Sequence, residues 1–360
     1  MAVYPEGCPR PTVVSVARSV TRRMKSNYCL DNRCFWYVHL RPGPGPTHKC
    51  QIIMTRSKSF RRCNALWFSY TATVFPILIL LLSLGCGLSS AGAPRPTPLP
   101  PTPTGAVPQF GQVVLVVEEN SSYSEVIGSS EMPYLNSLAM QYGLATQYFA
   151  NTHPSIGNYF MLTTGQIVTN DDSFAGRVDA DNIVRELLAS GKSWKSYAES
   201  RNDPLLYARR HDPLSYFSDV VDSSSQMQNL TLLSQFSSDL ANHVLPNFSF
   251  VVPNLLNDGH SGPLQLADSW LQDNIAPLIS NATFQRDGLL IIVFDEAATS
   301  DTTHGGGHVA AVIISTLAKQ GFQSTTLYQH QSVLRLILEG LGVPKLPGSS
   351  STAPKMGEFF

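Results

Sequence analysis

Four runs of aliphatic and β-branched residues constrain the fold of this chain more than any other feature. They are QVVLVV at 112–117, FSFVV at 248–252, LLIIVF at 289–294 and VAAVII at 309–314. Amphipathic, helix-like stretches lie between or after them, as at 266–279 and 330–342. Buried strands separated by amphipathic helices are typical of a largely parallel sheet covered on both faces. The sequence therefore predicts an α/β fold, a three-layer α/β/α sandwich, over residues 110–345.

Polar side chains follow three of these runs where each strand should end. They are Glu118, Glu119 and Asn120 after the first run, Asp258 and His260 after the second, and Asp295, Glu296, His304 and His308 after the third. Ligands of such sheets collect beyond the carboxyl ends of the strands, so we expect these side chains at one edge. Taken singly, a carboxylate there is more often a helix cap or a solvated loop residue, and the GGG of HGGGH is more often a flexible turn.

The adjacent acids Asp295 and Glu296 are the strongest of these signals. Two neighbouring acids at the end of a buried strand repel each other unless a proton or a cation intervenes. Together with Glu119 and the carbonyl of Asn120 they supply the oxygen ligands of a hard metal ion. The pattern predicts one divalent metal ion, with Ca²⁺, Mg²⁺ or Mn²⁺ favoured over Zn²⁺ or Fe²⁺.

The segment THPSIGNYF at 152–160 places Ser155 before a helix-like stretch. Serine is favoured at helix N-caps, so this segment alone fits an ordinary capped loop as well as a nucleophile. A metal beside Ser155 would lower the pKa of its hydroxyl, and the following helix N-terminus would hold an anion. The neighbouring acids therefore make Ser155 a candidate nucleophile.

Several short motifs occur in a fixed order along the chain. They are VVEEN, SYSEVIG, THPSIGNYFMLTTG, VPNLLNDGH, DSWL, FDEA and GGGHV, within about residues 112–343. This set resembles the phosphoesterase family of bacterial acid phosphatases and phosphatidylcholine-type phospholipases C, within the alkaline-phosphatase-like superfamily. Each motif is weak alone, and their common order makes the set specific.

The resemblance implies a metal site and a nucleophile at matched positions. Glu119 and Asn120 match the family's first metal-binding pair, and Asp295 and Glu296 match its second pair. Ser155 matches the nucleophile, which also touches the metal. The implied reaction is attack of Ser155 on phosphorus, followed by hydrolysis of the phosphoserine by water.

The resemblance also implies residues that contact the substrate. His153 and Asn158 sit where the family's nucleophile motif contacts the phosphoryl group. His260 and His308 match histidines that line the pocket, and imidazoles titrate near the working pH of most enzymes. We therefore expect these two to act as acid and base, whereas His304 matches no family position.

The substrate is less sharply indicated than the chemistry. Phospholipases of this family often have threonine as the nucleophile and longer chains, so Ser155 and the short C-terminal region favour hydrolysis of small phosphate monoesters. A phospholipase C-type phosphodiesterase is the main alternative. A sulfatase is less favoured, because the segment lacks the C/S-x-P-x-R context, and an inactive binding protein on the same scaffold is the least favoured.

The first part of the chain differs from the rest. All six cysteines lie at or before Cys86, so the region expected to fold has neither a disulfide nor a thiolate metal site. A basic segment from Met54 precedes the apolar run VFPILILLLSLGCG, which predicts a signal peptide or membrane anchor over 54–93. LSLGC resembles a bacterial lipobox ending at Cys86, and cleavage near SSAGA or an uncleaved anchor are the alternatives.

The remaining segments complete the expected organisation. Residues 1–53 show no sustained periodicity and are interpreted as a non-native or disordered extension; 94–109 form a Pro/Thr-rich linker and 346–360 a C-terminal tail. We expect a protein exported to the bacterial periplasm or cell surface, with membrane contact through the N-terminal segment or a lipidated Cys86. The net charge of −1 gives no attraction to nucleic acid. The oligomeric state is not indicated.

Overall fold

The computed structural model describes residues 37–42, 50–55 and 105–360. The chain divides into two units, Met1–Gly92 and Ala93–Phe360. In the first unit, β1 (Tyr37–Pro42) and β2 (Cys50–Thr55) form an antiparallel pair. The rest of the expected extension, the signal or anchor segment after Thr55 with Cys86, and most of the Pro/Thr-rich linker lie outside the described residues.

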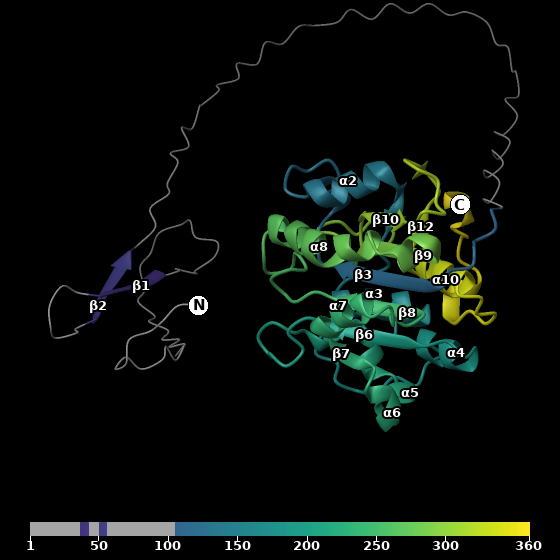
Figure 1. Ribbon diagram of the computed structural model, residues 1–360, viewed down its shortest axis with the longest axis horizontal. Coiled ribbons are helices and arrows are strands. Elements are labelled where there is room, and N and C mark those ends of the chain that lie inside the picture. Colours follow the sequence, from purple (N-terminus) through teal and green to yellow (C-terminus); the bar gives the residue numbers. More distant parts are fainter. Residues whose placement is uncertain (1–36, 43–49, 56–104) are drawn as a thin grey trace, which may run out of the picture. The chain divides into compact units, whose positions relative to one another are not determined.

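The second unit is built on an eight-stranded sheet in the order β11-β4-β10-β9-β3-β8-β6-β7 (Figure 1). Its strands are β3 (Gln112–Glu118), β4 (Gly143–Ala145), β6 (Trp194–Ala198), β7 (Leu230–Leu232), β8 (Phe248–Val252), β9 (Gly288–Phe294), β10 (Ala311–Ile314) and β11 (Gln323–Ser324). Every neighbouring pair is parallel except the two that involve β10. The predicted largely parallel sheet is therefore confirmed.

The direction of β10 follows from its connection to β9. A parallel neighbour needs a crossover, usually through a helix, whereas residues 295–310 contain no helix and return the chain directly beside β9. The strands β3, β8 and β9 are buried along their whole length, as their apolar runs predicted. β3 lies between β8 and β9, so the polar side chains that follow these three strands are brought to the same edge of the sheet.

Helices cover both faces of the sheet and complete the predicted three-layer α/β/α sandwich. The α-helices are α1 (Tyr123–Val126), α2 (Pro133–Gln141), α3 (Ser155–Thr164), α4 (Ile183–Ala189), α5 (Ser218–Val221), α6 (Ser224–Met227), α7 (Leu233–Ala241), α8 (Leu264–Ile279), α9 (Ala282–Asp287) and α10 (His330–Gly340). One group pairs α2 with α8, and another joins α10 to α3 and α4. The two predicted helices correspond to α8 and α10.

Short elements connect these layers. β5 (Tyr148–Phe149) pairs in parallel with β12 (Tyr328–Gln329), just before α3 and α10 respectively. The 3₁₀ helices are η1 (Arg209–His211), η2 (Pro213–Tyr216), η3 (Gly348–Ser351) and η4 (Gly357–Phe359). η1 and η2 both pack against α3. They bring the connection between β6 and β7 to the helix that carries Ser155.

The C-terminal residues belong to the same packed unit. Met356 and Phe359 are buried in the hydrophobic core, although the sequence pattern suggested a separate tail at 346–360. The amide N–H of Lys319 donates to the carbonyl of Phe359, which ties this segment to the loop before β11. Within the ranges that the structure describes, no helix is long and apolar enough to span a bilayer.

Candidate active site

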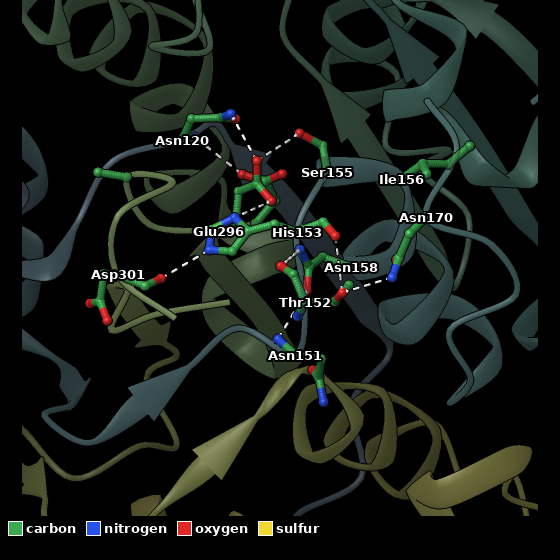
Figure 2. Close-up of polar contacts among 12 residues, drawn as sticks. Asn120, Asn151, Thr152, His153, Ser155, Ile156, Asn158, Asn170, Glu296 and Asp301 are labelled. Carbon is green, nitrogen blue, oxygen red and sulfur yellow. Dashed lines mark hydrogen bonds and ion pairs between the residues drawn. The ribbon is translucent and has the colours of Figure 1, made fainter. Parts of the chain in front are cut away.

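The two predicted metal-binding pairs meet because β3 and β9 are parallel neighbours whose last residues are in register. Glu119 and Asn120 follow β3 directly, and Asp295 and Glu296 follow β9. The backbone N–H of Asn120 donates to Oδ1 of Asp295 at 3.1 Å, and its Nδ2 donates to Oε1 of Glu296 at 3.0 Å (Figure 2). Asn120 has a φ of +34°, a region that asparagine tolerates better than most residues.

Ser155 is the first residue of α3 and is 2% exposed. Its Oγ lies 3.3 Å from Oε2 of Glu119 and 3.4 Å from Oε1 of Glu296, so its single proton can be donated to either carboxylate. The N-cap of α3 is Pro154, so the alternative in which Ser155 merely caps the helix is wrong. Figure 2 shows Ser155 and Asn120 approaching Glu296 from different segments.

Burial and mutual repulsion dominate the electrostatics of these carboxylates. Burial raises the pKa of Glu119 well above its ordinary value, and the nearby Asp258 and Glu296 raise it further. Burial also raises the pKa of Asp295, with added repulsion from Glu119 and Glu296. The pKa of Glu296 is raised by burial, while His153 acts against that shift. The cluster therefore needs protons or a cation to remain buried.

The residues present fit a hard divalent metal ion. Oδ2 of Asp295 and Oδ1 of Asn120 are buried and make no hydrogen bond with any described residue. Two oxygen atoms are therefore available as metal ligands. The His, Cys, Asp and Glu side chains of the described ranges do not by themselves form a group of three around one ion. The hydroxyl of Ser155 approaches Oε2 of Glu119 and Oε1 of Glu296, which suits a mixed oxygen site. The amide of Asn120 contacts Glu296 through Nδ2, so Oδ1 would face the same ion after the amide turned over.

Two residues that the sequence analysis missed contact Oε1 of Glu119, the oxygen that Ser155 does not contact. The hydroxyl of Tyr159 donates to Oε1 of Glu119 at 2.6 Å, and Nε2 of His211 lies 3.2 Å from the same oxygen. The two rings stack with centroids 5.1 Å apart. Tyr159 could have been found from its spacing of one helical turn after Ser155. His211 lies on η1, away from any strand end, and no local pattern marks it.

His260 is placed to exchange protons with solvent. Its Nδ1 lies 3.2 Å from Oε2 of Glu119, and its side chain is 31% exposed. Its backbone N–H donates to Oδ1 of Asp258, whose other oxygen lies 3.5 Å from Nδ1 of His211. Burial raises the pKa of Asp258 to about 7. His260 therefore lies beside Glu119, and its ring meets that of His211 edge-on with centroids 5.9 Å apart.

His153 and Asn158 flank Ser155, and their polar atoms contact other groups of the protein. Nε2 of His153 contacts the carbonyl of Asp301 at 2.9 Å and must donate, because a carbonyl only accepts. Its Nδ1 lies 2.9 Å from Oε2 of Glu296, so a proton lies between these two atoms. Asn158 is fully buried; its Oδ1 accepts from the N–H groups of Asn151 and Thr152, and its Nδ2 donates to the Thr152 carbonyl.

His308 is not brought to the carboxylates. Its Nε2 contacts the carbonyl of Thr146 at 3.0 Å, and its ring stacks on Tyr123 and Phe149. None of its contacts within the described residues reaches Ser155 or the acidic pairs. The expected acid or base role is therefore unsupported for His308, and His304 lies in the same aromatic group, edge-on to Phe149.

The fold is that of the alkaline-phosphatase-like proteins. A solved structure of an alkaline phosphatase superfamily protein from Vibrio parahaemolyticus matches with a TM-score of 0.50, covering 71% of this chain and 74% of that one at 13% identity. The fold expectation is thus confirmed. The Phosphoesterase family model matches residues 128–344, and the chain belongs to the Phosphoesterase family.

Curated relatives agree with this family. The chain is 30% identical over 266 residues to a phosphatidylinositol-3-phosphatase of Mycobacterium tuberculosis, covering 71% of this chain and 84% of that protein. It is 30% identical over 256 residues to a probable acid phosphatase of Kluyveromyces lactis, covering 66% of this chain and 59% of that protein. An acid phosphatase of Aspergillus fumigatus matches at 29% identity over 260 residues, 67% of this chain and 56% of that protein. The family predicted from the motifs is confirmed.

Proposed function

We propose that this protein is a hydrolase of phosphoric esters that cleaves small phosphate monoesters through a phosphoserine formed on Ser155. The observation that carries the proposal is the position of Oγ of Ser155, at the start of a buried helix and 3.3 Å from Glu119. A helix N-terminus favours an anion, and a phosphoryl group placed there would meet this hydroxyl. Family membership and the names of the relatives support the same chemistry.

The residues that would hold the divalent ion are Glu119, Asn120, Ser155, Asp295 and Glu296, with Ca²⁺, Mg²⁺ or Mn²⁺ favoured. When bound, the ion would lower the pKa of the Ser155 hydroxyl and offset the charge of the acids. The hydroxyl of Tyr159 orients Glu119 through its hydrogen bond, Nε2 of His211 lies 3.2 Å from the same oxygen without a hydrogen bond, and His153 orients Glu296. Asn158 holds the backbone of Asn151 and Thr152 and thereby positions the segment that leads to Ser155.

The covalent steps follow from this arrangement. Oγ of Ser155 gives its proton to Glu119, 3.3 Å away, and forms a bond to phosphorus; the bond between phosphorus and the ester oxygen breaks, and the leaving alkoxide takes a proton. His260 is the imidazole best placed to give that proton, because it contacts Glu119 and is also open to solvent. The same residue then accepts a proton from the water that hydrolyses the phosphoserine. Glu119 returns its proton to Oγ when water releases the phosphate.

A polar leaving group fits better than a lipid. An open cavity of about 620 Å³ adjoins the site at Asn120. Its polar lining is Ser121, Ser124, Glu125, Ser129 and Glu131, and its apolar lining is Ile127, Pro263, Leu264 and Ala298. Hydroxyl and carboxylate groups of this kind suit a hydroxylated alcohol rather than acyl chains. A phospholipase C-type phosphodiesterase remains the alternative function. Export through residues 54–93 is part of the proposal and rests on the sequence alone.

Replacing the nucleophile tests the proposal. Ser155→Ala should abolish phosphate release from monoesters while leaving folding and metal content nearly unchanged, because Ser155 is one of several oxygen donors and the proposed nucleophile. Ser269→Ala, an exposed position on α8, is the matched control and should keep full activity. Release of phosphorylated headgroups from phosphatidylcholine, without release of phosphate from monoesters, would instead support the diesterase. Undiminished turnover by Ser155→Ala would remove covalent catalysis.

A further inference from the structure

An aspartate and an arginine beside Ser155 are not used by the chemistry above. Oδ1 of Asp172 accepts a hydrogen bond of 3.2 Å from the backbone N–H of Ile156, the residue that follows Ser155. Its Oδ2 lies 3.5 Å from Nε of Arg210. Figure 2 shows Ile156 next to Ser155 at the start of the helix. A protein carboxylate therefore contacts the first turn of the nucleophile helix, where the phosphoryl group is expected.

The guanidinium of Arg210 has donor capacity that the described residues do not use. Its Nε is buried and makes no hydrogen bond with them, and the contact with Asp172 at 3.5 Å is an ion pair only. Arg210 directly precedes His211 on η1, which packs against α3. Burial raises the pKa of Glu119 and of Asp258, and the charge of Arg210 acts in the opposite direction on both. Its charge therefore reaches the site.

The charge balance of the site calls for such a cation. Four buried acids, Glu119, Asp258, Asp295 and Glu296, line the region around Ser155. A divalent ion offsets part of their charge, but a phosphate monoester brings up to two further negative charges, whereas a diester brings one. A guanidinium is well suited to bind phosphate because its planar N–H groups can donate in pairs. A monoester depends on this cation more than a diester does.

We infer that Arg210 binds the phosphoryl group of the substrate, and that Asp172 is an internal anion which holds Arg210 and the Ile156 amide until the substrate replaces it. This inference rests on the proposed function, because it assigns the phosphoryl group to Ser155. The side chain of Asp172 is 37% exposed, so it has room to turn toward solvent when it is displaced. Arg210 is then the residue that sets the preference for monoesters over diesters.

The two residues should show opposite effects on anion binding, which separates this inference from a structural ion pair. Arg210→Gln removes the cation and should raise the Kd of inorganic phosphate and the KM of a monoester by about 10- to 100-fold, the effect expected for a charged hydrogen bond. Its effect on a diester substrate should be smaller. Asp172→Asn keeps an acceptor for Ile156 but releases Arg210, so the same Kd and KM should fall several-fold.

The experiment uses the full chain, in its metal-loaded form, and measures phosphate binding by calorimetry in the Ser155→Ala background. Arg177→Gln is the matched control, because Arg177 forms an exposed pair with Asp222 at 2.6 Å and should leave phosphate affinity unchanged. Weaker phosphate binding in both Arg210→Gln and Asp172→Asn, or no change in Arg210→Gln, would overturn the inference. Because binding needs no turnover, a wild-type protein that hydrolyses no ester would refute the proposed function separately.

Discussion

The hydroxyl of Tyr159 donates a hydrogen bond of 2.6 Å to Oε1 of Glu119. Tyr159 lies one helical turn after Ser155, whose own hydroxyl contacts the other oxygen of Glu119. Burial raises the pKa of Tyr159 well above its ordinary value, so the phenol stays protonated and remains a donor. One helix therefore carries both the proposed nucleophile and the group that fixes the orientation of its carboxylate neighbour.

Tyr159→Phe is expected to lower both stability and turnover. The ring and its stacking on His211 are kept, but Glu119 loses its shortest hydrogen bond. A buried charged acceptor that loses a donor typically costs about 1–3 kcal/mol of the free energy of unfolding. Turnover should fall because Glu119 is no longer held in place beside Ser155. Chemical denaturation and steady-state kinetics on the same preparation measure the two effects.

A second tyrosine provides the control for this variant. The hydroxyl of Tyr197, on β6, donates to Oδ2 of Asp239 at 2.7 Å and is also fully buried. Tyr197→Phe should lower the free energy of unfolding by a similar amount while leaving kcat unchanged. Equal losses of kcat in both variants would show that turnover follows stability rather than the orientation of Glu119.

Gly157→Ala should disturb the nucleophile segment through steric overlap. A Cβ at position 157 would lie 2.1 Å from Oδ1 of Asn170 and 2.6 Å from Cγ2 of Thr152. Overpacking of this kind costs about 1–3 kcal/mol, and the displaced residues should also lower kcat. Adding Asn170→Ala removes the closest clash, so the double variant should regain part of the stability. A double-mutant cycle that shows simple additivity would contradict this account.

The sequence predicted the elements of the fold and the two acidic pairs because both depend on local patterns. Apolar runs such as 112–117 identify buried strands, and a parallel sheet brings the residues after its strands to one edge. His211 could not be found in this way, because it lies on a 3₁₀ helix that reaches the site only through packing against α3. Asp172 lies in a loop and accepts a hydrogen bond from the N–H of Ile156, and Arg210, on the same 3₁₀ helix as His211, contacts Asp172, so no period or spacing marks either residue.

The HGGGH segment shows the limit of local interpretation most directly. The sequence pattern favours a flexible turn for its glycines. In the structure Gly305 has a φ of +111°, and a Cβ at Gly306 would lie 2.4 Å from the carbonyl oxygen of Thr152. The segment therefore packs against the strand end that leads to Ser155, and glycine is required for that close approach. The same packing turns His308 toward Thr146 and away from the acids, which its position in the motif did not reveal.

The pH dependence of stability should include a contribution from His330. Its Nε2 donates to the carbonyl of Asp295 at 2.6 Å and its Nδ1 accepts from the hydroxyl of Tyr148, so the ring is neutral. Burial lowers the pKa of His330 to about 4, against about 6.5 for an unfolded histidine. Below pH ~6.5 the unfolded chain binds a proton that the folded protein does not. The contribution of His330 to the free energy of unfolding is therefore full above pH ~6.5 and falls by about 3 kcal/mol as the pH drops toward 4.

The comparison with His330→Gln isolates this contribution. The buried acids act with the opposite sign, since their raised pKa values favour the folded state at low pH, so the wild-type curve alone does not report on His330. The difference in free energy of unfolding between wild type and His330→Gln should shrink as the pH falls from 7 to 4.5. A difference that is constant over this range would contradict the assignment of a neutral, buried imidazole.

The proposed metal ion predicts how Asp295 affects thermal stability. A ligand that binds only the folded state stabilises it by about 2.7 kcal/mol at a hundredfold excess over Kd, so a chelator should lower the Tm of the wild type. In the wild type the N–H of Asn120 donates to Oδ1 of Asp295 at 3.1 Å. Asp295→Asn keeps an acceptor for this N–H but removes one buried charge. The variant should therefore lose its response to the chelator.

The order of the two proteins should also reverse when the metal is removed. Without the ion, repulsion between Asp295, Glu119 and Glu296 destabilises the wild type, and Asp295→Asn relieves it. The variant should then melt at the higher temperature in chelator, and the wild type at the higher temperature with metal. If these acids only cap the chain after β9, neither chelator nor the substitution should move the Tm, since asparagine caps as well as aspartate. A wild-type melt that is indifferent to chelator, in protein shown to be metal-loaded beforehand, would refute the metal site and the activation of Ser155 with it.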